Sequence, residues 1–330
     1  MKLKLIIIVV STVVISGVLG WVVVNKSLGK TPGIISPLAQ GYEERSGQYK
    51  FMFEHKTTTV YPPNDFFPRN LLPKYSDDLG LTAKGYAVMD RNTRELLLSK
   101  NLTHEVPIAS VAKIMTAIVV LEKSKKDQEL TVSESAAKIG EASMGLTGGE
   151  QVPVEELLYG LLLPSGNDAA ETLAQGLDGR VEFIISMNEK AKALGMFDTY
   201  FFNPTGLDGE TLSQTSFSTP LDLLALSNYA LESPIFANIV STYYKEFPYR
   251  EGKHKAYFLY NILQLDRAYP GIKGVKPGVT DFAGETLVSY AENGGKHVIV
   301  VILGSRQSRD DVVKIYDYIF PKLGVKIPGR

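Results

Sequence analysis

The order of elements along this 330-residue chain predicts an α+β fold: an antiparallel sheet flanked by helices, with an all-helical subdomain. A hairpin pattern comes first, with strands expected over Gly85–Asp90 and Arg94–Leu98. Helical periods then fill the middle of the chain, and two strand-like runs and a last helix follow near its end. The first and last strands can therefore share one sheet that lies over the helical subdomain.

The middle of the chain is expected to be helical because its apolar residues recur at helical spacing. The run Ser110–Leu121 is apolar on nearly every side, which is typical of a helix buried all round. The other elements expected from the same patterns are helices over Val154–Leu163, Asp168–Gly176 and Val181–Leu194, strands over Glu285–Ala291 and His297–Gly304, and a last helix over Asp310–Phe320.

The first 79 residues have a different character. Residues 5–24 form an uncharged run, and about 20 such residues suffice to cross a bilayer as a helix. The run is long for a signal peptide and lacks a small-residue cleavage site, so a retained anchor is favoured over a cleaved signal. We expect a membrane anchor with a transmembrane helix over residues 1–28, a Pro- and aromatic-rich linker over 29–79, and a globular domain over 80–330.

Composition excludes several classes of function. The net charge is -1 and no basic stripe interleaved with aromatics is present, which argues against nucleic-acid binding. Cysteine is absent, so disulfides and thiolate chemistry are excluded. None of the four histidines is paired at metal-ligand spacing, and no G-x-S-x-G elbow supports a Ser-His-Asp triad. Any nucleophilic chemistry is therefore expected to use another base.

Lysine can replace histidine as that base when a Ser-x-x-Lys spacing places both side chains on one helix face. Three such pairs occur, Ser27–Lys30, Ser110–Lys113 and Ser135–Lys138, where composition alone predicts roughly one. Only Ser110–Lys113 lies at the start of an apolar helix. Burial would lower the pKa of Lys113 and make it a base near neutral pH, although a lysine that reaches the surface is the alternative.

Two further polar segments carry weak signals when each is taken alone. Ser165-Gly-Asn167 follows the apolar run that ends at Pro164, where Ser and Asn would also serve as ordinary helix caps. Gly274–Gly284 contains Lys276-Pro277-Gly278 and opens into a strand, although Pro and Gly are equally typical of a plain loop.

In this order and spacing, the three segments resemble the S-x-x-K, S-D-N and K-T-G motifs of penicillin-binding proteins and class A β-lactamases. With Ser-Gly-Asn in the middle, the chain is similar to the low-molecular-mass D-alanyl-D-alanine carboxypeptidases. The resemblance covers roughly Gly80 to Phe320 and includes Ile108–Ala117, Met144–Glu150, Leu157–Ala170, Phe202–Asp208 and Gly274–Gly284. It implies a β-lactamase/transpeptidase-like fold and makes residues 80–330 a catalytic domain.

The resemblance also implies a reaction: removal of the terminal D-Ala from peptidoglycan stem peptides through an acyl-enzyme. Ser110 would be the nucleophile and Lys113 its base, while Ser165 would relay a proton and Asn167 would position Lys113 and the substrate. The backbone N–H groups of Ser110 and Val279 would form the oxyanion hole. The residues implied to bind substrate are Lys276, Pro277, Gly278, Val279, Thr280 and, for its carboxylate, Arg309, with Arg306 as the competitor.

The same resemblance implies no metal and no organic cofactor. The expected partners are stem peptides ending in D-Ala-D-Ala, β-lactam antibiotics as covalent inhibitors, and the lipid bilayer through residues 5–24. The catalytic domain would then lie outside the cytoplasm, on the cell-wall side of the cell membrane.

Pro277 departs from the family motif, which has Thr or Ser at that position. It lacks a hydroxyl and a backbone N–H, so weaker carboxylate recognition or an altered choice of substrate is expected, whereas proline on an open strand edge leaves the fold intact. A D,D-endopeptidase with the same residues and a catalytically impaired muropeptide-binding homologue remain alternatives. A β-lactamase is disfavoured because no E-x-x-L-N segment follows Asn167.

Overall fold

The computed structural model describes residues 66–125, 127–264 and 269–327. The transmembrane helix expected over residues 5–24 lies outside these ranges. Within the described ranges, no single helix has the length and hydropathy needed to cross a membrane. Helices α8 (Pro220–Ala230) and α9 (Pro234–Val240) meet that criterion only when taken together, and they are bent by 108°.

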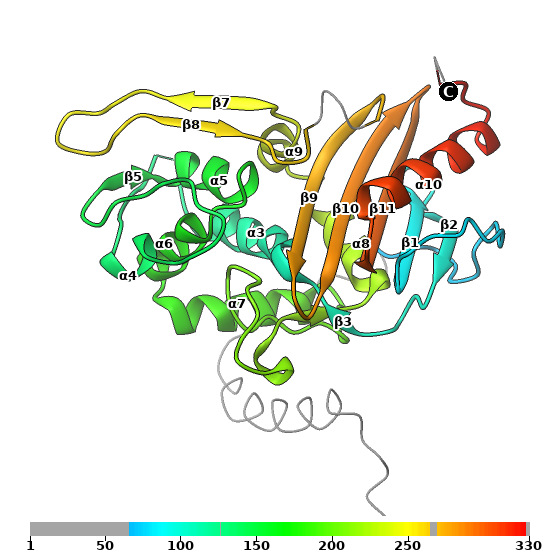
Figure 1. Ribbon diagram of the computed structural model, residues 1–330, viewed down its shortest axis with the longest axis horizontal. Helices are drawn as coiled ribbons and strands as arrows, with labels where there is room; N and C mark the ends of the chain where they lie inside the picture. The colour runs from blue at the N-terminus through cyan, green and yellow to red at the C-terminus, as the bar shows by residue number, and fades with distance from the viewer. Residues whose placement is uncertain (1–65, 126, 265–268, 328–330) are drawn as a thin grey trace, which may run out of the picture. The chain divides into compact units, whose positions relative to one another are not determined.

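The central element is a five-stranded antiparallel sheet in the order β2-β1-β11-β10-β9 (Figure 1). Its strands are β1 (Gly85–Asp90), β2 (Glu95–Lys100), β9 (Ile272–Thr280), β10 (Gly284–Asn293) and β11 (Lys296–Ser305). The expectation that the first and last strands share one sheet is confirmed, since β1 pairs with β11. Strand β9, which carries Pro277, lies at the edge of the sheet.

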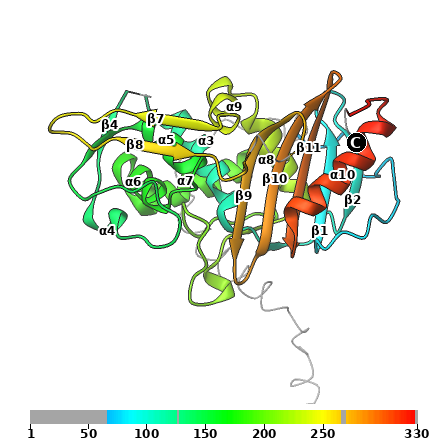
Figure 2. The same ribbon diagram turned by 45° about the horizontal axis from the view of Figure 1, so that its top comes forward.

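Helices cover both faces of the sheet, which explains why its central strand β11 is apolar without interruption from Val298 to Leu303. Successive side chains of a strand point to opposite faces. In β11, Val298, Val300 and Ile302 belong to the core beneath α10 (Ser308–Lys322). The residues between them join the core on the other face, where α8 packs (Figure 2).

The helical subdomain is built around α3 (Lys113–Lys123), whose first eight residues are all buried. The helices around it are α4 (Glu134–Ala137), α5 (Val154–Leu162), α6 (Asn167–Leu177) and α7 (Arg180–Ala193). The prediction of a helix buried on every side is thus confirmed, with one difference. The chain enters α3 through a 3₁₀ turn, η1 (Ala109–Ala112), so the nucleophile candidate precedes the regular helix.

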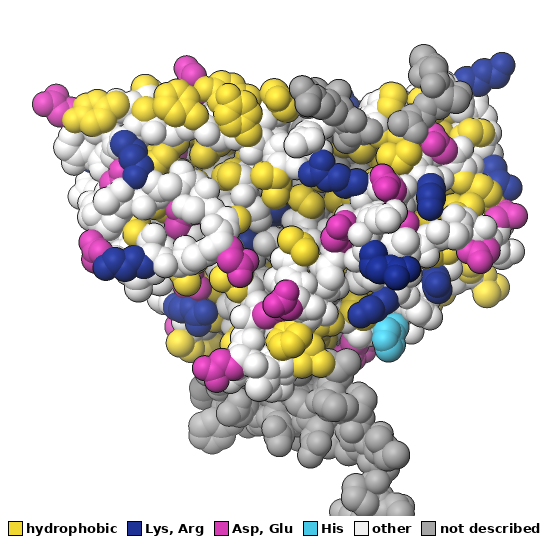
Figure 3. Space-filling model, viewed as in Figure 1, with side chains coloured by type: hydrophobic (Ala, Val, Ile, Leu, Met, Phe, Trp, Pro, Cys, Tyr) yellow, Lys and Arg dark blue, Asp and Glu magenta, His cyan; other side chains and the backbone are white. Residues whose placement is uncertain are grey.

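Several short elements had no clear periodic signal in the sequence. They are β3 (Val106–Pro107) paired with β6 (Phe217–Ser218), β4 (Glu129–Thr131) with β5 (Gln151–Pro153), β7 (Tyr244–Phe247) with β8 (Tyr257–Tyr260), and the turn η2 (Leu212–Gln214). The β7–β8 hairpin exposes alternate residues of β8, Phe258 and Tyr260. Hydrophobic side chains are visible along it at the upper left of Figure 3.

Residues 66–79 run beside the outer edge of β2. The backbone N–H groups of Arg69, Lys74 and Tyr75 donate to carbonyls of residues 94, 96 and 97 at 2.9, 2.9 and 3.0 Å. The ring of Tyr75 also packs edge-on against Tyr318 of α10. This segment therefore forms hydrogen bonds with carbonyl groups at or beside β2 that would otherwise be exposed at the edge of the sheet.

Candidate active site

Ser110 and Lys113 face each other across one turn of the chain. Both lie at η1, and in a 3₁₀ turn residues i and i+3 are stacked on the same side. The Nζ atom of Lys113 lies 3.0 Å from Ser110 Oγ. Lys113 is completely buried while Ser110 is partly exposed, so the hydroxyl faces the open side of the pair.

The other two partners of Lys113 are both carbonyl oxygens. Its Nζ lies 2.7 Å from Asn167 Oδ1 and 2.7 Å from the backbone oxygen of Thr205. A neutral amine has two N–H groups and one lone pair. The two closer acceptors take up both N–H groups, so the lone pair of the neutral amine is left for the Ser110 hydroxyl. The arrangement suits a base that removes the serine proton.

Burial gives Lys113 the protonation behaviour that this role needs. Desolvation lowers the pKa of Lys113 to about 7, and the negative charges of Glu141 and Asp168 act weakly in the opposite direction. A substantial fraction of the side chain is therefore neutral at physiological pH.

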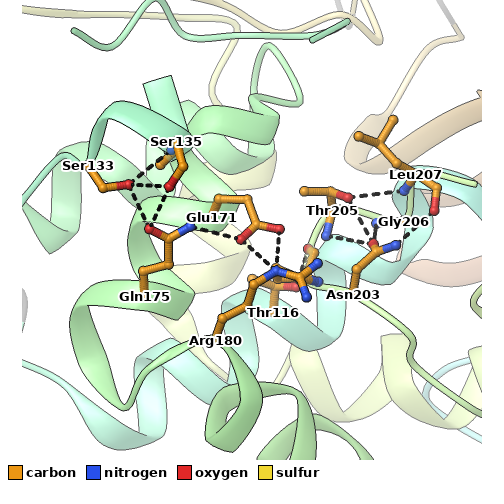
Figure 4. A network of polar contacts seen from close by, with 12 residues as sticks. Thr116, Ser133, Ser135, Glu171, Gln175, Arg180, Asn203, Thr205, Gly206 and Leu207 are labelled. Atoms are coloured by element: carbon orange, nitrogen blue, oxygen red, sulfur yellow. Dashed lines mark hydrogen bonds and ion pairs between the residues drawn. The ribbon is translucent and has the colours of Figure 1, made fainter. Parts of the chain in front are cut away.

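The Thr205 carbonyl that contacts Lys113 belongs to a turn organised by the side chain of Asn203, and Figure 4 shows the hydrogen bonds of this turn. Asn203 Oδ1 accepts from the backbone N–H and hydroxyl of Thr205 at 3.1 and 2.8 Å and from Gly206 N at 2.7 Å. Asn203 Nδ2 donates to Leu207 O at 2.8 Å. The Thr116 hydroxyl of α3 donates to Pro204 O at 2.7 Å, which ties this turn to the helix that carries Lys113.

Asn167 also fixes the loop on the other side of Lys113. Its backbone N–H donates to Ala142 O at 2.7 Å and its Nδ2 to Gly140 O at 3.0 Å. The next residue, Asp168, is fully buried, and its carboxylate accepts from the Ser143 hydroxyl and from the backbone N–H groups of residues 144–146, all at 2.6–3.0 Å. Residues 167 and 168 together therefore determine the path of the loop over residues 140–146.

Ser165 lies between α5 and α6 with its backbone in the left-handed region, at φ +68°. The residue is only 3% exposed, yet within the described residues its hydroxyl has no hydrogen-bond partner. A non-glycine residue in this conformation is strained and persists only when its surroundings impose it. Its hydroxyl is therefore available to a bound molecule.

Strand β9 forms the opposite wall and lies directly against the start of η1. A Cβ atom at Gly278 would lie 2.7 Å from Ser110 N, so only glycine allows this approach. Lys276 is fully buried, and burial, followed by the nearby charge of Lys113, lowers its pKa well below the usual value. Its Nζ donates to Pro277 O at 3.0 Å.

These segments enclose a cleft of about 620 Å³. It is lined by Ser110, Glu141, Ala142, Ser165, Asn167, Ile262, Pro277, Gly278, Val279, Glu285, Arg306, Gln307, Ser308, Arg309 and Asp310. Residues of the three sequence motifs, which begin at Ser110, Ser165 and Lys276, thus meet at one site. Lys113 and Lys276 lie buried behind its surface.

Thr280 and the two arginines differ in how the surrounding protein holds their side chains. The Thr280 hydroxyl donates to Asp208 Oδ1 at 2.9 Å and is thus occupied within the protein. Arg309 donates to Ile262 O at 2.6 Å, which holds its guanidinium in place. Arg306 also lines the cleft, but its side chain has no polar partner within the described residues.

The sequence patterns did not assign Thr205, Asp168 and Glu141 to the site. Thr205 contributes a backbone carbonyl, which no residue type signals. Asp168 follows Asn167 directly, and its position at the start of a helix was the available signal. Glu141 lies on a loop and has its backbone in the left-handed region, a conformation that no periodic pattern predicts.

Comparison with known proteins agrees with this geometry. The model of the D-alanyl-D-alanine carboxypeptidase family matches residues 74–307, well over half of the chain. D-alanyl-D-alanine carboxypeptidase DacF of Bacillus subtilis is 33% identical over 256 residues, which are 75% of this chain and 64% of that protein. The chain thus spans slightly less than two thirds of the length of the Bacillus enzyme.

Two other relatives cover more of their own length. A D-alanyl-D-alanine endopeptidase of Pseudomonas aeruginosa is 33% identical over 220 residues, 66% of this chain and 69% of that protein. The crystal structure of the Streptomyces K15 DD-transpeptidase superposes with a TM-score of 0.66 at 32% identity, covering 72% of this chain and 97% of the transpeptidase. Ser110 contacts the buried Lys113, the three motifs meet at one cleft, and the family model matches most of the chain, so the chain belongs to the D-alanyl-D-alanine carboxypeptidase family of serine peptidases.

Proposed function

We propose that this protein is a serine-type D-alanyl-D-alanine carboxypeptidase that removes the terminal D-Ala from peptidoglycan stem peptides. The observation that carries the proposal is the 3.0 Å contact between Ser110 Oγ and the buried Nζ of Lys113, whose pKa is about 7. Such a pair supplies both a nucleophile and a base in its neutral form at physiological pH.

In the acylation step, Lys113 takes the Ser110 proton as Oγ attacks the carbonyl carbon of the penultimate D-Ala. The negative charge that develops on the carbonyl oxygen is stabilised by the backbone N–H groups of Ser110 and Val279. The C–N bond then breaks as the Ser165 hydroxyl gives its proton to the departing amine of the terminal D-Ala and takes up the proton that Lys113 removed from Ser110, which leaves Lys113 neutral again. In deacylation, Lys113 accepts a proton from the attacking water and gives it to Ser110 Oγ as the ester bond breaks, which restores the Ser110 hydroxyl.

Recognition of the terminal carboxylate is assigned to the positive wall of the cleft. Lys276 and Arg309 are the proposed cationic ligands, and the backbone from Pro277 through Val279 borders the peptide. Lys276 has no acidic partner among the described residues and has a lowered pKa. A substrate carboxylate would favour the protonated form of Lys276, so the positive charge on Lys276 would form when the substrate binds.

The position of the domain relative to the membrane is also part of the proposal. We infer an anchor over residues 1–28 inserted through residues 5–24, a linker over 29–79, and a catalytic domain over 80–330 on the cell-wall side of the membrane. The support is the uncharged N-terminal run and the location of the proposed substrate. β-Lactams would act as covalent inhibitors by acylating Ser110.

A D,D-endopeptidase is the second candidate, favoured specifically by the similarity to the Pseudomonas aeruginosa endopeptidase. Both reactions would use the same nucleophile, base and proton relay. They differ in whether a free D-Ala or a second stem peptide leaves.

The test has two parts. Labelling with a fluorescent penicillin is expected for the wild type and lost in Ser110→Ala, and an equal signal in both proteins would refute Ser110 as nucleophile. Digestion of defined monomeric and cross-linked muropeptides, with identification of the products, then separates the activities. Free D-Ala from monomers supports the carboxypeptidase, cleavage of dimers alone supports the endopeptidase, and labelling without either product supports an impaired homologue.

A further inference from the structure

Glu141 is an acidic residue in the cleft to which the reaction described above gives no role. Glu141 lines the same cleft as Ser110, and the residue is exposed. Within the described part of the chain, no hydrogen bond or ion pair engages its carboxylate. The carboxylate is therefore free to meet a ligand.

The backbone at Glu141 is held in a conformation that a glutamate adopts rarely. Its φ is +65°, in the left-handed region, where a non-glycine residue is strained. Asn167 clamps the residue from both sides, since its Nδ2 binds Gly140 O and its backbone N–H binds Ala142 O. Asn167 also contacts Lys113, so one residue connects the backbone on both sides of Glu141 to the proposed base.

The charges in the cleft are divided between its two walls. Arg306 and Arg309 follow β11 at the start of α10, on the side of the sheet. Glu141 lies on the loop of the helical subdomain, close enough for its charge to act on Lys113. The two other acids that line the cleft, Glu285 and Asp310, lie on the sheet side. The carboxylate of Glu285 accepts hydrogen bonds from the backbone N–H and the hydroxyl of Ser308. Glu141 is thus the acid of the helical wall.

A peptide whose carboxylate binds the arginine side leaves its acyl portion toward the helical wall. We propose that Glu141 is a specificity-determining residue that binds an ammonium group on the acyl part of the substrate, the part that stays on Ser110. This inference rests on the proposed acyl-transfer function and adds the charge of the preferred substrate. A side-chain amine near the cleaved bond has the required chemistry, because it donates several hydrogen bonds to a carboxylate.

The test compares two matched pairs of compounds in each protein. Ampicillin differs from benzylpenicillin by one ammonium group on the acyl side chain, and the acylation rate constant of Ser110 is measured for both. Nα-acetyl-lysyl-D-Ala-D-Ala differs from its Nε-acetylated form by the side-chain charge, and kcat/KM for release of D-Ala is measured for both. The result is expressed as the ratio of the value for the cationic compound to the value for its neutral partner. A substitution that only changes the reactivity of Lys113 affects both compounds equally and leaves this ratio unchanged.

The wild type is expected to favour the cationic member of each pair by about three- to tenfold, as for an ion pair at a partly solvated site. Glu141→Gln should bring the ratio to about one, and Glu141→Lys should bring it below one. Glu251→Gln removes an exposed acid at the tip of the β7–β8 hairpin and should keep the wild-type ratio. High salt should reduce the wild-type preference, because it screens the pair.

The outcomes separate the inference from the proposed function. A wild-type ratio of one for both pairs, or a ratio that Glu141→Gln leaves unchanged, overturns the role of Glu141 even if D-Ala is released. If neither peptide is cleaved while the penicillin pair shows the expected ratios, the carboxypeptidase proposal fails and the role of Glu141 stands.

Discussion

Lys113 lies fully buried with its Nζ 3.0 Å from Ser110 Oγ, so a titratable amine shielded from bulk water contacts a hydroxyl that faces the cleft. Two fixed carbonyl oxygens take up the remaining hydrogen-bonding capacity of the amine. The surrounding protein thus determines both the charge of this lysine and the direction of its lone pair. The role of the pair can therefore be tested by measuring how the reaction rate changes as Lys113 gains or loses its proton.

Acylation by penicillin should depend on pH through Lys113. The base is active when neutral, and burial lowers its pKa to about 7. The rate constant should therefore fall about tenfold for each pH unit below 7 and level off above about pH 8. Stopped-flow acylation between pH 5 and 9 measures this profile. A rate that stays constant across the range would show that Lys113 is not the base.

Replacing Asp168 with asparagine should destabilise the site and slow acylation. The carboxylate accepts three backbone N–H groups and a hydroxyl from residues 143–146, and an amide would present N–H groups to donors. A loss of about 2–4 kcal/mol in the free energy of unfolding is expected. Urea titration measures it, with Asp281→Asn as the exposed control. Equal stability of the two variants would contradict this role.

Asp222 should make the protein less stable as the pH rises through neutrality. Burial raises its pKa to about 7 from a usual value near 4, so the folded state favours the protonated acid. The protonated Asp222 stabilises the folded state fully below the pKa that this carboxyl has in the unfolded chain. This contribution to the free energy of unfolding is lost as the pH rises through 7, and its upper limit is about 4 kcal/mol. Unfolding in urea from pH 4 to 8.5 tests this. Asp222→Asn should flatten the profile, and parallel profiles would exclude Asp222 as its source.

The sheet and the central helix were predictable because burial leaves direct patterns in the chain. Strand β11 is covered on both faces and therefore reads as an unbroken apolar run. Helix α3 is enclosed on all sides, which made Lys113 conspicuous as its one buried charge. For Ser110, the 3₁₀ turn changed the local geometry but kept the spacing of three residues that brings the two side chains together.

Other parts of the site depend on contacts that no local pattern contains. The Thr205 carbonyl reaches Lys113 across 92 residues and is held there by the side chain of Asn203. Glu141 has its backbone in the left-handed region, and Asn167 holds the neighbouring residue Gly140 by a hydrogen bond. Both are consequences of tertiary packing, since the groups involved are a main-chain oxygen and a loop residue.

The two arginines of the cleft should differ in their effect on carboxylate recognition. Arg309 is held by Ile262 O at 2.6 Å, whereas Arg306 has no such restraint within the described residues. Arg309→Ala should reduce kcat/KM by about 10- to 100-fold for a peptide with a free terminal carboxylate. Arg306→Ala should have a smaller effect. Peptides with a C-terminal amide provide the control, because neither variant should change their slow turnover. The reverse order of effects would assign the carboxylate to Arg306.

Pro277→Thr should increase activity on D-Ala-D-Ala peptides. Pro277 lies on the edge strand β9 and lines the cleft, so threonine would add a hydroxyl and a backbone N–H without disturbing an inner strand. One hydrogen bond to a charged group is worth about 1.5–3 kcal/mol, which corresponds to a gain of about 10- to 100-fold in kcat/KM. Pro277→Ala restores only the N–H and therefore separates the two contributions. If threonine gives no gain while both variants fold as the wild type does, Pro277 does not limit recognition, and the residue belongs to the normal site of this protein.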